Sequence, residues 1–67
     1  MTDFPQTLKE LRLERQLTQS ALADLLIINQ RTISSWETGI REPDYEMLVK
    51  IAKFFDVTTD YLLGVED

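Results

Sequence analysis

Cysteine and histidine are both absent from this chain of 67 residues. Zinc sites draw on these two residue types, and disulfide or thiol redox chemistry requires cysteine, so these roles are excluded. Ser-His and Cys-His nucleophile pairs are excluded as well, which leaves carboxylates, lysine and tyrosine for acid-base work. The sequence therefore disfavours an enzyme, and we expect no catalytic residue, no cofactor, no metal ion and no small-molecule ligand.

Long apolar runs are also missing, and the sequence contains neither a secretion signal nor a lipidation motif. These absences predict a cytoplasmic protein without a membrane partner. A chain of 67 residues has room for a single hydrophobic core. We therefore expect one domain over residues 1–67.

Glycine and proline are scarce, with two of each, and all four lie at plausible ends of segments. Between them the apolar residues recur at spacings of three and four, which is typical of amphipathic helices and not of strands. The spacing predicts an all-α fold, a compact bundle of five short helices.

Each expected helix has a recognisable start or stop residue. The expected helices run from near Pro5 to residue 15 or 16, over 19–26 after the cap Thr18, over 30–38 between Asn29 and Gly39, from the cap Asp44 through residue 55, and from the cap Thr58 to Gly64. The fourth has the most complete apolar stripe, at Leu48, Ile51, Ala52 and Phe55. We expect Phe54, Phe55, Tyr61, Leu62, Leu63 and Val65 to pack the core, or in part to remain for a twofold interface.

Residues 18–38 carry the functional information, because only about three residues separate the second and third helices. Such a short connection forces a tight turn and a steep crossing, which is helix-turn-helix geometry. On a helical wheel Ile33, Trp36 and Glu37 share one side of the third helix. The other side is polar and carries mostly short side chains: Arg31, Ser34, Ser35 and Thr38. A face of this kind can enter the major groove of DNA, where amides and guanidiniums hydrogen-bond to base edges.

Several short motifs occur in a fixed order along nearly the whole chain. They are Leu17-Thr18-Gln19, Leu22-Ala23, Thr32 through Gly39, Arg41-Glu42-Pro43, Ile51-Ala52-Lys53 and Asp60 through Gly64. With this order and spacing the chain resembles the phage repressor and Cro family of helix-turn-helix regulators, also called the XRE family. The resemblance implies the five-helix fold of the phage repressor DNA-binding domain, with its helix-turn-helix at about residues 18–38.

The resemblance also implies a function. A member of this family is a sequence-specific regulator of transcription that binds double-stranded DNA through the major groove. We expect a repressor that binds a pseudo-palindromic operator as a homodimer, with the two recognition helices about 34 Å apart. The dimer contacts are expected from the C-terminal segment around residues 61–65.

The DNA-contacting residues are assigned by the same resemblance. Gln19, at the start of the second helix, matches a position that contacts phosphate, aided by the helix N-terminus. The remaining assigned residues are Asn29, Gln30 and Arg31 at the groove floor and edge, Ser34 and Ser35 facing the groove, and Thr38 with Arg41 at the phosphate-contacting end.

Five further residues match structural positions of the family. Ala23 is expected where the second and third helices touch, and Ile33 and Trp36 anchor the recognition helix in the core. Arg12 and Glu37 match a partly buried salt bridge between the first and third helices, which fixes orientation more than it adds stability.

Two residues depart from the family pattern. Ile27 stands where the family commonly has a glycine in a left-handed backbone conformation, which is costly for a β-branched residue. We expect either a different turn conformation or burial of Ile27 to offset the strain. Gln16, in the turn after the first helix, is a milder departure of the same kind.

Each proposed contact has an ordinary structural alternative. Gln30 and Arg31 also suit a solvated helix start, exposed hydroxyls are common on helices, and Gln19 suits the first position of any helix. The whole chain has an alternative too, motivated by its net charge of −5: a helical protein-interaction module, antitoxin-like or anti-repressor, without an operator of its own.

The negative charge is unevenly distributed along the chain. Residues 1–41 hold five basic and five acidic residues, whereas residues 42–67 hold two basic and seven acidic ones. With Glu37 paired to Arg12, the proposed DNA face is locally positive through Arg31 and Arg41. The acidic segment therefore lowers non-specific DNA affinity without forbidding sequence recognition.

Overall fold

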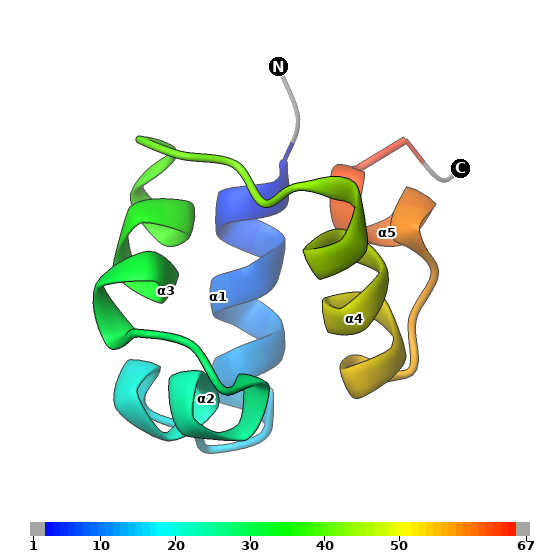
Figure 1. Ribbon diagram of the computed structural model, residues 1–67. Coiled ribbons are helices and arrows are strands. Elements are labelled where there is room, and N and C mark those ends of the chain that lie inside the picture. The colour runs from blue at the N-terminus through cyan, green and yellow to red at the C-terminus, as the bar shows by residue number, and fades with distance from the viewer. Residues whose placement is uncertain (1–2, 66–67) are drawn as a thin grey trace.

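The computed structural model describes residues 3–65, which form five α-helices and no strand (Figure 1). The helices are α1 (Phe4–Glu14), α2 (Gln19–Leu26), α3 (Gln30–Thr38), α4 (Tyr45–Phe55) and α5 (Thr59–Leu63). In Figure 1 α1 runs through the middle, α3 lies on one side of it, α4 and α5 lie on the other, and α2 crosses below. The expected all-α fold is confirmed. Two acids of the acidic segment, at positions 66 and 67, lie outside the described residues.

Side-chain caps start four of the five helices at the residues that the sequence predicted. The cap oxygen accepts a backbone N–H bond in each case: Thr18 from Ala21 at 3.0 Å, Asn29 from Arg31 at 2.8 Å, Asp44 from Met47 at 2.8 Å and Thr58 from Tyr61 at 3.0 Å. Each cap contributes about 1 kcal/mol to its helix. The longest helices have 11 residues, and within residues 3–65 none has the length and apolar character to cross a bilayer.

The core lies between α1 and the other four helices. Trp36 of α3 is 4% exposed and meets Phe4 of α1 edge to face, with ring centroids 6.3 Å apart. The other buried apolar side chains are Leu8, Leu11, Leu22, Ala23, Leu26, Ile33, Ile51, Ala52, Phe55 and Leu62. The third helix is thus held by its apolar side, so its polar side remains outside.

The C-terminal residues divide between core and surface. Phe55 and Leu62 are buried, and Phe54 and Leu63 are partly buried against the core. Tyr61 and Val65 are 44% and 62% exposed, so of the two places expected for these residues they take the surface and not the core. The reason is that α5 has only five residues, so with Leu62 turned inward its neighbour Tyr61 turns outward.

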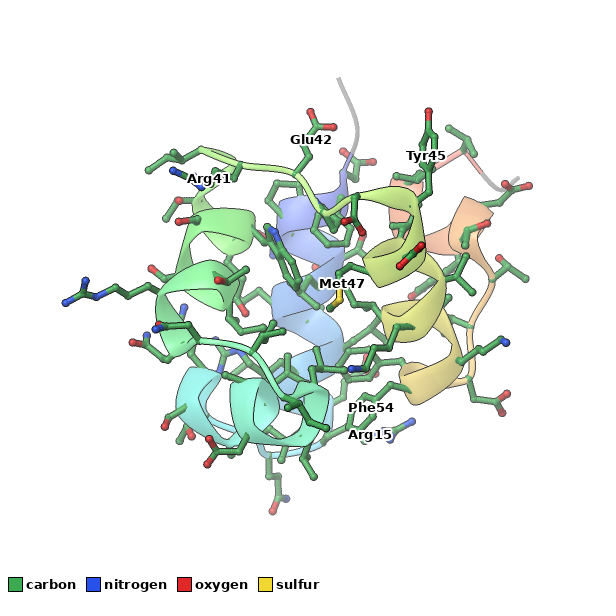
Figure 2. The ribbon with its side chains drawn as sticks, in the orientation of Figure 1. Arg15, Arg41, Glu42, Tyr45, Met47 and Phe54 are labelled. Carbon is green, nitrogen blue, oxygen red and sulfur yellow. The ribbon has the colours of Figure 1, made fainter. Side chains whose placement is uncertain are left out.

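Arg15 fastens the end of α1 to the end of α4. Its guanidinium lies 5.8 Å and 5.4 Å from the ring centroids of Phe54 and Phe55, and it donates a 3.2 Å hydrogen bond to the Phe55 carbonyl. Figure 2 shows Arg15 beside Phe54, remote from Arg41, which lies on the loop after α3. This arginine therefore stabilises the packing of α1 against α4. It does not lie on the side of the molecule that α3 occupies.

Gly64 packs against the beginning of the chain. Its φ is +74°, and a Cβ built on it would lie 2.8 Å from Asp3 Oδ2 and 2.9 Å from Asp3 Cβ. Gly39, with φ +79°, offers a comparison, because a Cβ there would meet Pro5 Cγ at an ordinary 3.7 Å.

We expect Gly64→Ala to lower the free energy of unfolding more than Gly39→Ala does. Both changes place alanine in the left-handed region, which costs about 1 kcal/mol, and only the first adds a clash. Urea denaturation of the two variants measures the difference. Asp3→Gly removes the clashing Cβ and should rescue Gly64→Ala but not Gly39→Ala, whereas equal losses in both alanine variants would contradict the contact.

Candidate nucleic-acid interface

The turn between α2 and α3 is left-handed at Ile27, with φ 60° and ψ 48°. Ile27 is also 84% exposed. We expected either another turn conformation or burial of Ile27 to offset the strain. Both expectations are wrong, because the turn keeps the left-handed conformation that favours glycine and the side chain is exposed. Ile28 packs against the core in its place. Gln16 is likewise left-handed, with φ 57°.

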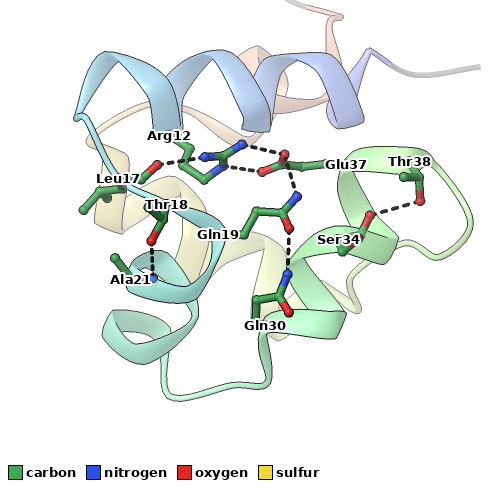
Figure 3. Close-up of polar contacts among 9 residues, drawn as sticks. All are labelled: Arg12, Leu17, Thr18, Gln19, Ala21, Gln30, Ser34, Glu37 and Thr38. Carbon is green, nitrogen blue, oxygen red and sulfur yellow. Dashed lines mark hydrogen bonds and ion pairs between the residues drawn. The ribbon is translucent and has the colours of Figure 1, made fainter.

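Arg12 and Glu37 form the salt bridge between α1 and α3 (Figure 3). Arg12 Nε donates to Glu37 Oε2 at 2.7 Å and Nη2 donates to Oε1 at 3.0 Å. The third nitrogen, Nη1, donates to the Leu17 carbonyl at 2.8 Å. The two side chains are 9% and 4% exposed, so the pair fixes α3 against α1 and against the chain that enters α2.

This environment keeps Arg12 charged. The hydrogen bond to Glu37 raises the pKa of Arg12 above its ordinary value, and the charge of Glu37 acts in the same direction. Burial acts against this by disfavouring the charged form, but it is the smaller influence than the hydrogen bond. Arg12 therefore keeps its positive charge inside the bridge.

Two glutamines extend the bridge to the surface. Gln19 Nε2 donates to Glu37 Oε1 at 3.2 Å, and Gln19 Oε1 accepts a 2.7 Å hydrogen bond from Gln30 Nε2. Figure 3 shows this chain of contacts running from Arg12 to Gln30. The first residues of α2 and α3 are thereby joined through their side-chain amides.

The polar side of α3 faces outward. Arg31 and Thr38 are exposed, and Ser34 and Ser35 are partly buried. The Thr38 hydroxyl donates back to the Ser34 and Ser35 carbonyls at 3.0 Å and 3.2 Å, so a bond from it to an outside acceptor must replace these. Asn29 Oδ1 serves as the α3 cap, which leaves its amide nitrogen to donate elsewhere.

A shallow depression on this side is lined by Arg31, Thr32, Ser35 and Arg41. The end of α3 creates it, because the Ile40 and Arg41 amides both donate to the Ser35 carbonyl, at 3.0 Å and 3.3 Å, and curl the chain back. Two arginines separated by ten positions thus border one hollow. Thr32 was not among the residues predicted from the sequence; its place one residue after Arg31 was the available signal.

Comparison with known proteins agrees with this geometry. The family model for the helix-turn-helix matches residues 8–62. The chain belongs to the helix-turn-helix family of transcriptional regulators. It is of the XRE type, as the resemblance implied, and these regulators bind DNA and are not enzymes.

Individual relatives of this helix-turn-helix regulator cover most of its length. The uncharacterized HTH-type transcriptional regulator YqaE of Bacillus subtilis is 43% identical over 63 residues, which is 94% of this chain and 54% of that protein. The HTH-type transcriptional activator BcrR of Enterococcus faecalis is 43% identical over 65 residues, which is 97% of this chain and 32% of that protein. The chain thus spans about half, or less, of the length of these relatives.

A solved structure shares the fold. The crystal structure of a transcriptional regulator from Listeria innocua matches with a TM-score of 0.91 and 30% sequence identity, covering 100% of this chain and 63% of that one. The five-helix arrangement of this helix-turn-helix regulator is therefore that of a known regulator.

Substitution of Glu37 tests the buried bridge of this regulator. We expect Glu37→Gln to lower the free energy of unfolding by about 2 to 3 kcal/mol, because it leaves the Arg12 charge buried without its counterion. Glu10→Gln is the matched control, since Glu10 accepts only an exposed 3.1 Å bond from Gln6, and it should change stability by less than about 0.5 kcal/mol. Urea denaturation compares the two, and similar losses would mean that the bridge does not fix α3.

Proposed function

We propose that residues 1–67 form one DNA-binding domain that recognises a specific sequence in double-stranded DNA, with residues 18–38 as the reading unit and α3 in the major groove. The observation that carries the proposal is the bond between Gln19 and Gln30 at the outer ends of α2 and α3. The bond orients the Gln30 side chain, at the start of α3, for hydrogen bonding to DNA.

Gln30 keeps the groups that a base contact needs. One hydrogen of its amide nitrogen is used by Gln19, which leaves the second hydrogen and the carbonyl oxygen. A donor and an acceptor side by side on one amide match N7 and the N6 amino group of adenine. The chain of contacts back to Arg12 supports this reading, because a preordered side chain loses little conformational entropy on binding.

Arg31, Ser34 and Ser35 are proposed to reach further base edges. The exposed guanidinium of Arg31 suits O6 and N7 of guanine, and the short serine side chains permit close approach of the helix. Arg41, across the depression from Arg31, is proposed to bind the phosphate at the edge of the groove.

The start of α2 and the ends of α3 are proposed to hold the flanking phosphates. The first amides of a helix lack intrahelical acceptors, and the cap Thr18 takes up only that of Ala21. The amides of Gln19 and Ser20 therefore suit a phosphate oxygen, together with the helix dipole. Asn29 and Thr38 complete the proposed contacts.

Selection from random duplexes, followed by sequencing of the bound pool, tests the proposal. We expect an enriched, twofold-symmetric motif, and affinity for the selected duplex that falls as salt is raised.

Arg31→Ala should weaken binding by about 1 to 3 kcal/mol and relax the sequence preference, which fluorescence anisotropy measures. Lys53→Ala is the control, since it removes an exposed charge on α4.

Three outcomes separate the alternatives. Equal effects of Arg31→Ala and Lys53→Ala would overturn the assignment of the reading face. A pool without any preferred sequence would overturn specific recognition and favour the protein-interaction module. A hydrophobic protein interface would also show little dependence on salt.

We further propose that the regulator binds DNA as a homodimer through residues 61–65. The exposure of Tyr61 and Val65 supports this, because apolar side chains outside the core are available for an interface. They belong to an acidic part of the sequence, since residues 42–67 carry the whole net charge of −5. Two copies that meet there repel each other until salt screens the charges.

Analytical ultracentrifugation tests the dimer. We expect the dimer dissociation constant to fall as NaCl is raised from about 50 to about 500 mM, the opposite of the salt effect on DNA binding. Tyr61→Ala should weaken the dimer. Leu25→Ala, which removes a more exposed apolar side chain on α2, should not. A strict monomer with and without the selected duplex would rule the dimer out.

Repression is the proposed direction of regulation. A protein bound at a promoter represses by occupying DNA that the polymerase needs, and this requires only the DNA-binding unit. The relative BcrR is named an activator, so a promoter-reporter assay with and without the regulator decides between the two directions.

A further inference from the structure

Lys50 reaches from α4 to the turn between α2 and α3. Its Nζ donates a 2.7 Å hydrogen bond to the carbonyl oxygen of Leu26. Leu26 is the last residue of α2, and its carbonyl belongs to the peptide that leads into Ile27. The last carbonyls of an α-helix have no intrahelical donor. Lys50 therefore caps α2 from a distance of 24 residues in the sequence.

The end of α2 has no cation of its own. Its last turn contains no basic residue, and Asp24 places a negative charge near the negative end of the helix dipole. A positive group at this end stabilises a helix, and a negative one destabilises it. Lys50 supplies from α4 the charge that the sequence of α2 lacks.

The same carbonyl borders the strained residue. Ile27 is left-handed and 84% exposed, so packing of its side chain does not offset the strain. The Ile27 and Ile28 amides donate to the Asp24 and Ala23 carbonyls at 3.2 Å and 2.9 Å, which closes the turn on its α2 side. Lys50 holds it from the α4 side.

We propose that Lys50 is a positioning residue for the recognition helix α3. By fixing the Leu26 carbonyl, it holds the left-handed turn where the family commonly has glycine. That turn leads within three residues to Asn29, the cap of α3, and so to Gln30 and Arg31. The support of the turn by Lys50 is independent of the proposed function. The expected effect of Lys50 on DNA binding rests on the proposed function.

Amide hydrogen exchange tests the structural part. Lys50→Met keeps the apolar stem and removes the donor, and Lys53→Met makes the same change three residues away. We expect the Ile27 and Ile28 amides to exchange about two- to fivefold faster in Lys50→Met, the range that a cation at a helix C-terminus provides. Lys53→Met should leave them unchanged, and Lys50→Arg should largely retain protection.

The variant Ile27→Gly distinguishes two roles for Lys50: support of the strained turn, or an ordinary surface contact. Glycine adopts the left-handed conformation without strain, so Lys50→Met should accelerate exchange less in the Ile27→Gly background than in the natural one. An equal acceleration in both backgrounds would overturn the proposal. So would equal exchange in Lys50→Met and Lys53→Met.

DNA binding tests the consequence. With a duplex selected from the random pool and an unrelated duplex, Lys50→Met should lower the ratio of specific to non-specific affinity about two- to fivefold. Lys53→Met should leave the ratio unchanged. Faster exchange without loss of this ratio would overturn the role in positioning α3. If the natural chain shows no sequence preference, the proposed function fails, and the exchange data alone decide whether Lys50 holds the turn.

Discussion

The ion pair of Arg12 and Glu37 is the contact on which the reading unit depends. One guanidinium binds the end of α3, through Glu37, and the loop before α2, through the Leu17 carbonyl. Glu37 in turn accepts from Gln19, and Gln19 from Gln30. The helix crossing and the orientation of a surface amide are therefore set by the same buried charge. Because a buried pair of this kind adds little net stability, its contribution here is geometric.

Much of the fold was predictable because its signals are local. Thr18, Asn29, Asp44 and Thr58 cap helices through bonds to residues two or three positions ahead, which sequence spacing captures directly. The exposure of Tyr61 was not predictable in this way. An apolar residue in a helix of five residues has no repeated stripe to show which side it occupies.

For the candidate site, the sequence indicates residues but not their arrangement. Gln19 and Gln30 were both singled out, yet their mutual bond depends on how α2 crosses α3. The left-handed conformation at Ile27 does not follow from the sequence for a related reason. Steric rules identify the strain of a β-branched residue in a left-handed turn, but the contact that borders it comes from Lys50, on a helix 24 residues away from Leu26. Contacts of that separation leave no periodic pattern.

The net charge of the chain explains why the bonds of Arg12 to Glu37 and of Lys50 to Leu26 matter for the proposed function. Nucleic-acid affinity that comes from phosphate neutralisation is sequence-independent, and the net charge of −5 is expected to lower it for this chain. The acidic excess lies in residues 42–67, while Arg31 and Arg41 border the depression beside α3. Under the proposed function, affinity then comes mainly from hydrogen bonds to base edges, which preordered donors form at a lower entropic cost. Under the proposed function, weak electrostatic attraction requires a rigid reading unit, and the bonds of Arg12 to Glu37 and of Lys50 to Leu26 are the contacts we propose to support it.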